Sequence, residues 1–153
     1  MDTEPGTRAD TIEELSRLVK SAAYELDRLV TDHLDGMSVR QWHVLATLEG
    51  GVGKPMSALA EATLLPGPSL TRLIDGMVDG NLVLRKADIV DRRRVLVYQT
   101  KRGASRYQRI RDRLNKSEPL RALCGQQQLR TEQLTELLAA LRTPGLSATD
   151  DRS

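Results

Sequence analysis

Aromatic residues and cysteine are scarce in this 153-residue sequence, which holds one Trp, three Tyr, no Phe and a single Cys. Leucine, valine and alanine must therefore supply most of the apolar core, a composition that suits helices. A single cysteine excludes an internal disulfide framework and fits a reducing cytoplasm. The length corresponds to one domain with a modest core, and we expect part of its apolar surface to be buried by a partner.

The sequence also lacks a long apolar run. No segment approaches the roughly 20 apolar residues that a membrane-spanning helix requires. The N-terminal stretch from Met1 to Asp10 is polar and acidic, unlike a signal peptide. We therefore expect a soluble, cytoplasmic protein without a membrane partner.

Residues for catalysis or metal binding are few. His33, His43 and Cys124 show no metal-ligand spacing, and the sequence contains neither a phosphate-cradling glycine loop nor a nucleophile elbow. These absences predict a protein that is not an enzyme and that holds no cofactor or metal. Cys124 lies late in an apolar segment, where a buried inert thiol is the common outcome and a redox switch is the alternative.

Charge is unevenly distributed along the chain, although the net charge is only +2. Residues 1–35 carry nine acids against four bases, whereas residues 67–102 carry eight bases against four acids. Such segregation is what a local nucleic-acid footprint requires, while the near-neutral average limits indiscriminate binding.

The segment Pro68 to Gly80 predicts an amphipathic helix, because proline is tolerated at a first helical position and Gly67 can cap it. Gly80 and Asn81 then end the helix. Apolar residues recur at spacings of three and four and predict one buried face: Leu70, Leu73, Ile74, Met77 and Val78. The opposite face is mostly short-chained and would let the helix approach base edges: Ser69, Thr71, Arg72, Asp75 and Gly76. A solvated surface helix is the alternative for this segment alone.

Two strand-like runs follow, at residues 82–86 and 95–100, and they enclose a charged tip at residues 87–94. An isolated arginine triplet usually marks only a solvated loop. Next to a candidate recognition helix, however, the hairpin predicts a winged helix-turn-helix. We expect Asp91 to hold Arg93 or Arg94 extended through a charge-assisted hydrogen bond.

The whole sequence divides into five predicted segments: a disordered tail at 1–9, a long helix at 10–35, a DNA-binding lobe at 36–102, C-terminal helices at 103–142 and a second tail at 143–153. Within the lobe, Ser38 and Gln41 form a capping-box pattern. The run 54–56 could add a third strand, and Ser57 could cap the next helix. Apolar residues at helical spacing in 10–35 and 126–141 exceed what one small lobe can cover.

The wing residues also resemble a known family. Residues 91–103, DRRRVLVYQTKRG, resemble the D-R-R-x-x-x-V-x-L-T-x-x-G wing of the MarR family of transcriptional regulators. Residues 57–61 resemble its S-x-L-A-E helix, and residues 70–75 its V-T-R-L-V-D recognition helix. The sequence departs from the family pattern at Leu64, where glycine is usual, at Gly76, where a long base is usual, and at Gln99, where a buried leucine is usual.

The resemblance implies a mainly α-helical fold with a small antiparallel β wing, whose terminal helices pair with those of a second copy. It implies a homodimeric repressor that binds a pseudo-palindromic double-stranded DNA operator. The expected DNA contacts are Ser38, Arg40, Pro68, Ser69, Thr71, Arg72, Asp75, Lys86, Asp91, Arg92, Arg93 and Arg94. The main alternative is a winged helix that serves as a protein-protein interaction module.

The family's usual control is a small phenolic or lipophilic effector, and the resemblance implies one here. Three residues could line a ligand cleft between the DNA-binding lobe and the terminal helices: His33, Trp42 and His43. Such side chains more often cap a helix or pack in the core, and that reading stays open.

Overall fold

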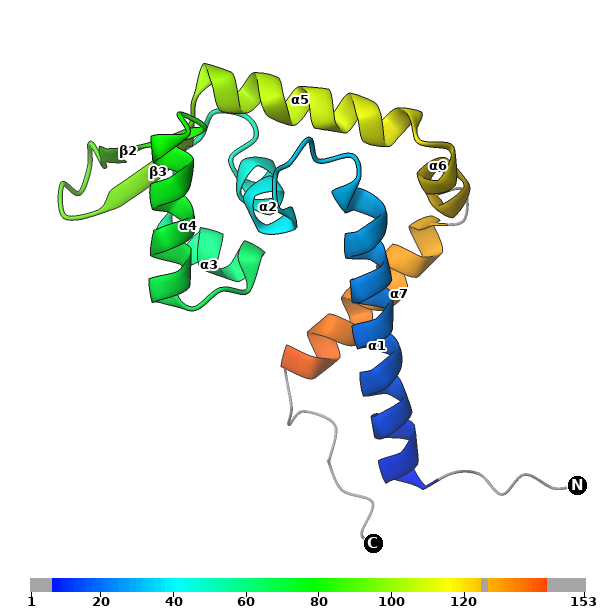
Figure 1. The fold of residues 1–153 in the computed structure, drawn as a ribbon. Coiled ribbons are helices and arrows are strands. Elements are labelled where there is room, and N and C mark those ends of the chain that lie inside the picture. The colour runs from blue at the N-terminus through cyan, green and yellow to red at the C-terminus, as the bar shows by residue number, and fades with distance from the viewer. Residues whose placement is uncertain (1–6, 125–126, 143–153) are drawn as a thin grey trace, which may run out of the picture. The chain divides into compact units, whose positions relative to one another are not determined.

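The computed structural model describes residues 7–124 and 127–142 (Figure 1). Its elements in chain order are α1 (Arg8–Thr31), α2 (Val39–Thr47), β1 (Lys54–Pro55), α3 (Met56–Thr63), α4 (Gly67–Asp79), β2 (Val83–Ala87), β3 (Val95–Gln99), α5 (Lys101–Lys116), α6 (Glu118–Cys124) and α7 (Gln127–Arg142). The mainly helical fold with a small antiparallel sheet is as predicted. No helix in the described ranges is long and apolar enough to cross a membrane. Residues 1–6 of the predicted tail at 1–9, the predicted tail at 143–153 and the Cys124 side chain lie outside the described structure. The last residues of the first predicted tail are not a tail, since Thr7 caps α1 and the helix begins at Arg8.

The chain divides into two compact units, with the boundary after Leu114. The first unit contains α1 to α4, the sheet and most of α5; the second contains α6 and α7. The core of the first unit is aliphatic, as the scarcity of aromatics predicted. Its fully buried side chains are Leu34, Val44, Leu45, Leu48, Leu59, Leu70, Ile74, Met77, Val83, Val97 and Ile110.

Helices α2, α3 and α4 form the helix-turn-helix. The capping box predicted for α2 is present, since the Ser38 hydroxyl accepts from the Gln41 N–H and the Gln41 side chain accepts from the Ser38 N–H. The prediction that Ser57 caps the next helix is wrong, because Ser57 lies inside α3. The helix begins at Met56, and Pro55 precedes it without a side-chain hydrogen bond. Leu64 ends α3 in the left-handed region at φ 54°, a conformation that favours the glycine usual in the family.

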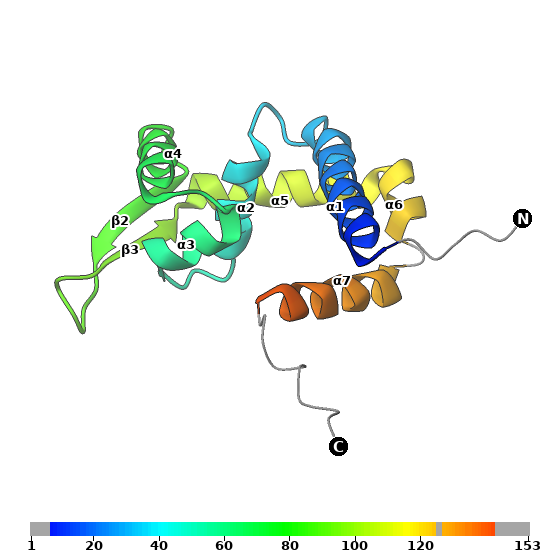
Figure 2. The same ribbon diagram turned by 90° about the horizontal axis from the view of Figure 1, so that it is seen from below.

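The sheet has the strand order β1-β3-β2, with both pairs antiparallel. Lys54 pairs with Val97 from one side and Arg85 pairs with Val97 from the other. The third strand predicted near residue 54 therefore exists, as a two-residue strand. Figures 1 and 2 both show the β2–β3 ribbon leaving the helical lobe beside α4 and ending in a free tip, which we call the wing tip (residues 88–94).

Thr100 anchors the base of this ribbon. Its hydroxyl donates to the backbone carbonyl of Asn81 (2.7 Å) and lies 3.1 Å from that of Leu82, and the Gly103 N–H donates to the same hydroxyl oxygen (2.9 Å). The backbone of Gly103 lies so close to Leu82 that a β-carbon at residue 103 would overlap the Leu82 carbonyl. The first turn of α5, which begins at Lys101, is thus packed directly against the start of the wing.

Polar contacts also tie α5 to the loops that flank α2. Arg106 donates to the Asp35 carbonyl (2.6 Å), and Arg111 pairs with Glu49. Burial raises the pKa of the Tyr107 phenol, the neighbouring Glu49 carboxylate raises it further, and Arg111 opposes that rise. The phenol is therefore held neutral, so its O–H can donate to Glu49 (3.4 Å).

Helix α1 begins two residues before the predicted start. Thr7 and Asp10 form a capping box, and hydrogen bonds from the Thr7 side chain and backbone lower the pKa of the Asp10 carboxyl. Only Val30 of this helix is buried. The apolar residues at helical spacing stay largely exposed in the single chain: Ile12, Leu15, Leu18, Val19, Leu26 and Leu29.

We expect Gly103→Ala to destabilise the fold by about 1–3 kcal/mol, because the added methyl group overlaps a backbone carbonyl that cannot move without displacing the wing. Gly76→Ala is the matched control. Its β-carbon meets nothing within 4 Å, and alanine in a helix interior should stabilise by roughly 0.5–1 kcal/mol. Urea denaturation of both variants checks the pair, and equal stabilities would contradict the close approach.

Candidate nucleic-acid interface

Helix α4 presents a polar, exposed face from its first turn onward. Leu70, Ile74 and Met77 are buried as predicted, which directs the other side of the helix outward. The predicted burial of Val78 is wrong, since its side chain is 36% exposed. The helix begins at Gly67 with Pro66 before it, so Gly67 is the first helical residue and not the cap. All the predicted base-facing residues of this helix are exposed: Pro68, Ser69, Thr71, Arg72 and Asp75.

An ion pair connects this helix to the wing. Arg85 of β2 places Nη1 at 2.6 Å from Oδ1 of Asp75, with both side chains partly exposed. Because the pair is solvated, it adds little stability. Its consequence is geometric, since it orients Asp75 toward the ribbon, while Ser69, Thr71 and Arg72 stay exposed on the same helix.

The wing tip is a backbone-ordered turn. The Asp88 N–H donates to the Arg94 carbonyl (2.9 Å), and the Arg94 N–H donates to the Asp91 carbonyl (2.9 Å). The Asp91 carboxylate accepts from the Arg93 backbone N–H (3.0 Å). Our expectation that Asp91 binds an arginine side chain was therefore wrong, since no ion pair joins them in the described ranges. The short Asp91 side chain reaches the nearby amide, which orders the backbone and leaves the guanidinium groups of residues 92–94 exposed.

The other predicted phosphate contacts lie at the edges of these two elements. Lys86 lies on β2 with its Nζ 5.7 Å from the centre of the Tyr98 ring, a cation–π contact that steadies a flexible side chain. Arg40 lies exposed in the first turn of α2. Ser38 is also exposed, but its hydroxyl already caps α2. Its contribution to a phosphate site would therefore be to hold the helix start in place.

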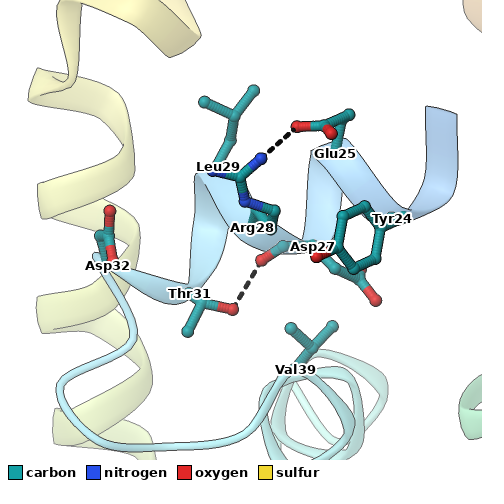
Figure 3. A pocket seen from close by; sticks show the side chains of 8 residues that line it. All are labelled: Tyr24, Glu25, Asp27, Arg28, Leu29, Thr31, Asp32 and Val39. Atoms are coloured by element: carbon teal, nitrogen blue, oxygen red, sulfur yellow. Dashed lines mark hydrogen bonds and ion pairs between the residues drawn. The ribbon is translucent and has the colours of Figure 1, made fainter. Parts of the chain in front are cut away.

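A pocket of about 580 Å³ lies between the end of α1 and the start of α2 (Figure 3). Figure 3 shows Val39 of α2 pointing toward the α1 residues that form the opposite wall. The lining mixes apolar and charged side chains: Tyr24, Glu25, Asp27, Arg28, Leu29, Thr31, Asp32 and Val39. A second pocket of about 530 Å³ shares Asp27 and Val39 with the first and extends to α3.

The three predicted ligand residues do not converge on one pocket. His43 lines the second pocket, together with Ser38 and Arg40. The His33 ring nitrogen Nδ1 lies 3.1 Å from the Leu29 carbonyl, as expected for a side chain that caps the end of α1. Trp42 is partly buried against the core, 5.2 Å from the His43 ring, and its buried indole N–H has no hydrogen-bond partner in the described structure.

Residues 35–94 match the family model described as the MarR family. Over this segment the chain is similar to the MarR family. This match spans the helix-turn-helix and the wing tip, the parts in which the sequence motifs predicted a winged-helix transcriptional regulator. No curated protein matches the sequence.

Three solved structures share the fold over most of the chain. A mutant MarR from E. coli complexed with operator DNA is 22% identical, with a TM-score of 0.71 over 90% of this chain and 100% of that one. The transcriptional repressor CouR, bound to a 23-mer DNA duplex, is 17% identical, with a TM-score of 0.70 over 92% and 100%. The regulator BldR from Sulfolobus solfataricus is 20% identical, with a TM-score of 0.71 over 90% and 99%.

Sequence reasoning missed one residue of this candidate interface, Arg85. In the sequence, Arg85 is only one of the two bases that end a short apolar run. Its partner Asp75 lies ten residues earlier, on a different element. The helix-to-strand turn at Gly80 and Asn81 brings the two together, and only a three-dimensional arrangement of that turn could have revealed the pair.

Two serines near helix starts allow a matched test of the interface's support. Ser38→Ala should cost about 1 kcal/mol of unfolding free energy, because it removes the hydroxyl that caps α2. Ser57→Ala should be nearly neutral, since Ser57 lies inside α3 and is exposed. Urea titrations monitored by circular dichroism measure both, and equal losses would contradict the assignment of the cap.

Proposed function

We propose that this protein is a MarR-type homodimeric repressor that binds a pseudo-palindromic DNA operator and is released by a small effector. The observation that carries the proposal is the pairing of an exposed polar helix with an arginine-tipped ribbon, connected by the ion pair between Asp75 and Arg85. These are the two parts that a winged helix offers to adjacent grooves of a duplex.

In the proposed complex, α4 enters the major groove with Ser69, Thr71 and Arg72 nearest the bases. The long Arg72 side chain suits the two acceptors of guanine, whereas the short hydroxyl side chains let the helix lie deep. The wing arginines lie beside the minor groove and its phosphates. Arg40 and Lys86 add phosphate contacts, which contribute affinity and not sequence preference.

A second copy accounts for the exposed apolar face of α1. Leu15, Leu18 and Val19 are 39–49% exposed, although they lie at the spacing of a buried helix face. On α7, Leu134 and Leu138 are also more than half exposed. Contact with the terminal helices of another copy would remove these side chains from water. Two-fold symmetry then sets the half-site spacing at about one helical turn, roughly 10 bp.

The two pockets that share Asp27 and Val39 are the proposed effector site. They lie where the proposed dimerisation helix α1 meets the first helix of the DNA-binding lobe. A lipophilic or phenolic ligand there would contact Tyr24, Leu29 and Val39, and it would change how α1 packs on α2. That change would alter the separation of the two recognition helices in the dimer.

Selection of bound sequences from random duplex DNA at physiological salt tests the proposal, because low salt rewards any basic surface. A two-fold symmetric motif is the expected result. Enrichment of no sequence would instead favour the winged helix as a protein-protein module. In that case, charge reversal of Arg92, Arg93 and Arg94 would leave DNA binding unaffected.

Arg93→Ala should weaken binding to the selected operator by about 1–3 kcal/mol, since it removes one groove contact. Dimerisation should not change, because Arg93 lies at the exposed wing tip. Arg109→Ala, which removes the same charge from an exposed site on α5, is the control and should have a small effect. Fluorescence anisotropy at physiological salt measures both affinities. If both variants lost the same affinity for DNA, the wing arginine would contribute only its charge and no groove contact.

Leu18→Glu should shift the protein toward monomer, because it places a charge within the proposed apolar contact of α1. Ser16→Glu adds the same charge at a neighbouring position of the helix outside the apolar stripe and should leave the association unchanged. Sedimentation velocity over a range of concentrations distinguishes the two. A Leu18→Glu dimer as tight as the wild type would exclude α1 from the interface.

A further inference from the structure

Two bulky apolar side chains form the apex of the wing tip. Ile89 is 94% exposed and Val90 is 95% exposed, the highest values among the large apolar residues of the described structure. Neither joins the core, so folding gains almost nothing from them. Exposed apolar residues are common singly, but two adjacent ones at the end of a projecting hairpin present a distinct apolar point.

The apex is held in a defined conformation. The Val90 N–H donates to the Asp88 carboxylate (3.0 Å), and the Asp88 N–H closes the hairpin onto the Arg94 carbonyl (2.9 Å). A turn ordered in this way loses less conformational freedom on binding than a free loop. The turn therefore holds Ile89 and Val90 in one arrangement, directly before the three arginines in the sequence.

The charged residues beside the apex indicate which kind of partner it can contact. Arg92, Arg93 and Arg94 follow directly and are all exposed, so an apolar partner protein would have to cover three charges at once. A DNA minor groove accommodates both chemistries, because phosphates line its edges while sugar and base edges form its walls. Proteins that bind this groove commonly combine arginines with an apolar wedge such as isoleucine.

We propose that Ile89 and Val90 are DNA-contacting residues that pack inside the minor groove at the flank of the operator, while the neighbouring arginines neutralise the phosphates. The inference rests on the proposed operator binding and adds to it an apolar contact with the sugars. This contact would favour flanking sequences whose minor groove opens readily, such as pyrimidine–purine steps.

The test compares three full-length proteins on the selected operator: the wild type, the double variant Ile89→Ser with Val90→Ser, and Val52→Ser. Val52 is 63% exposed in the loop before β1 and serves as the control for loss of a surface apolar side chain. Thermal melting should be equal for all three, because none of these residues belongs to the core.

The double variant should bind about tenfold more weakly than the wild type, since two partly buried side chains are lost. The slope of log affinity against log salt should stay the same, because that slope counts neutralised phosphates. Arg93→Ala should behave differently and reduce the slope by about one. Hydroxyl-radical footprinting, which reports sugar accessibility in the minor groove, should show that flank protection is lost only in the double variant and not in Val52→Ser.

Wild-type affinity and intact flank protection in the double variant would overturn the inference, while leaving the operator-binding proposal in place. Failure of the wild type itself to protect any operator would instead remove the proposed function, and this inference with it. Retained protection of major-groove guanines against dimethyl sulfate in the double variant would confirm that the loss is confined to the wing.

Discussion

The close packing of Gly103 against the Leu82 carbonyl is the constraint on which the geometry of the reading surface depends. It brings the start of α5 against the start of β2, and Thr100 then fixes both through hydrogen bonds to Asn81 and Leu82. The ribbon consequently leaves the lobe in one direction. The Asp75–Arg85 ion pair, although weak in energy, joins α4 to the ribbon whose base this junction holds.

Stability and recognition are supplied by different side chains in this lobe. Aliphatic residues such as Leu70, Ile74 and Val97 fill the core, whereas the outward positions of the same elements carry hydroxyls and bases. This division follows from helix and strand periodicity, since each element can bury only one face. Charges therefore reach the surface without a desolvation cost, and substitution of an outward arginine should alter binding more than folding.

The sequence predicted most of the fold because its signals were local. The capping box at Ser38, the apolar rhythm of α4 and the strand runs around the wing each act within a few residues. The errors were also local. Ser57 proved to lie inside α3, and Asp91 bonds a backbone amide where an arginine side chain was expected. In the first case the helix begins before the serine, and in the second the short aspartate side chain accepts from a backbone N–H two residues away.

By itself, the sequence determined the order of elements, the aliphatic core and the arginine-rich wing, because propensity, spacing and charge are properties of the chain alone. Only the tertiary structure decided the pairing of Asp75 with Arg85, the pockets at Asp27 and Val39, and the exposure of the α1 stripe and the Ile89–Val90 apex. Apolar periodicity shows which residues share a face. It does not say whether the chain covers that face, since coverage depends on residues distant in sequence that folding brings close or leaves apart.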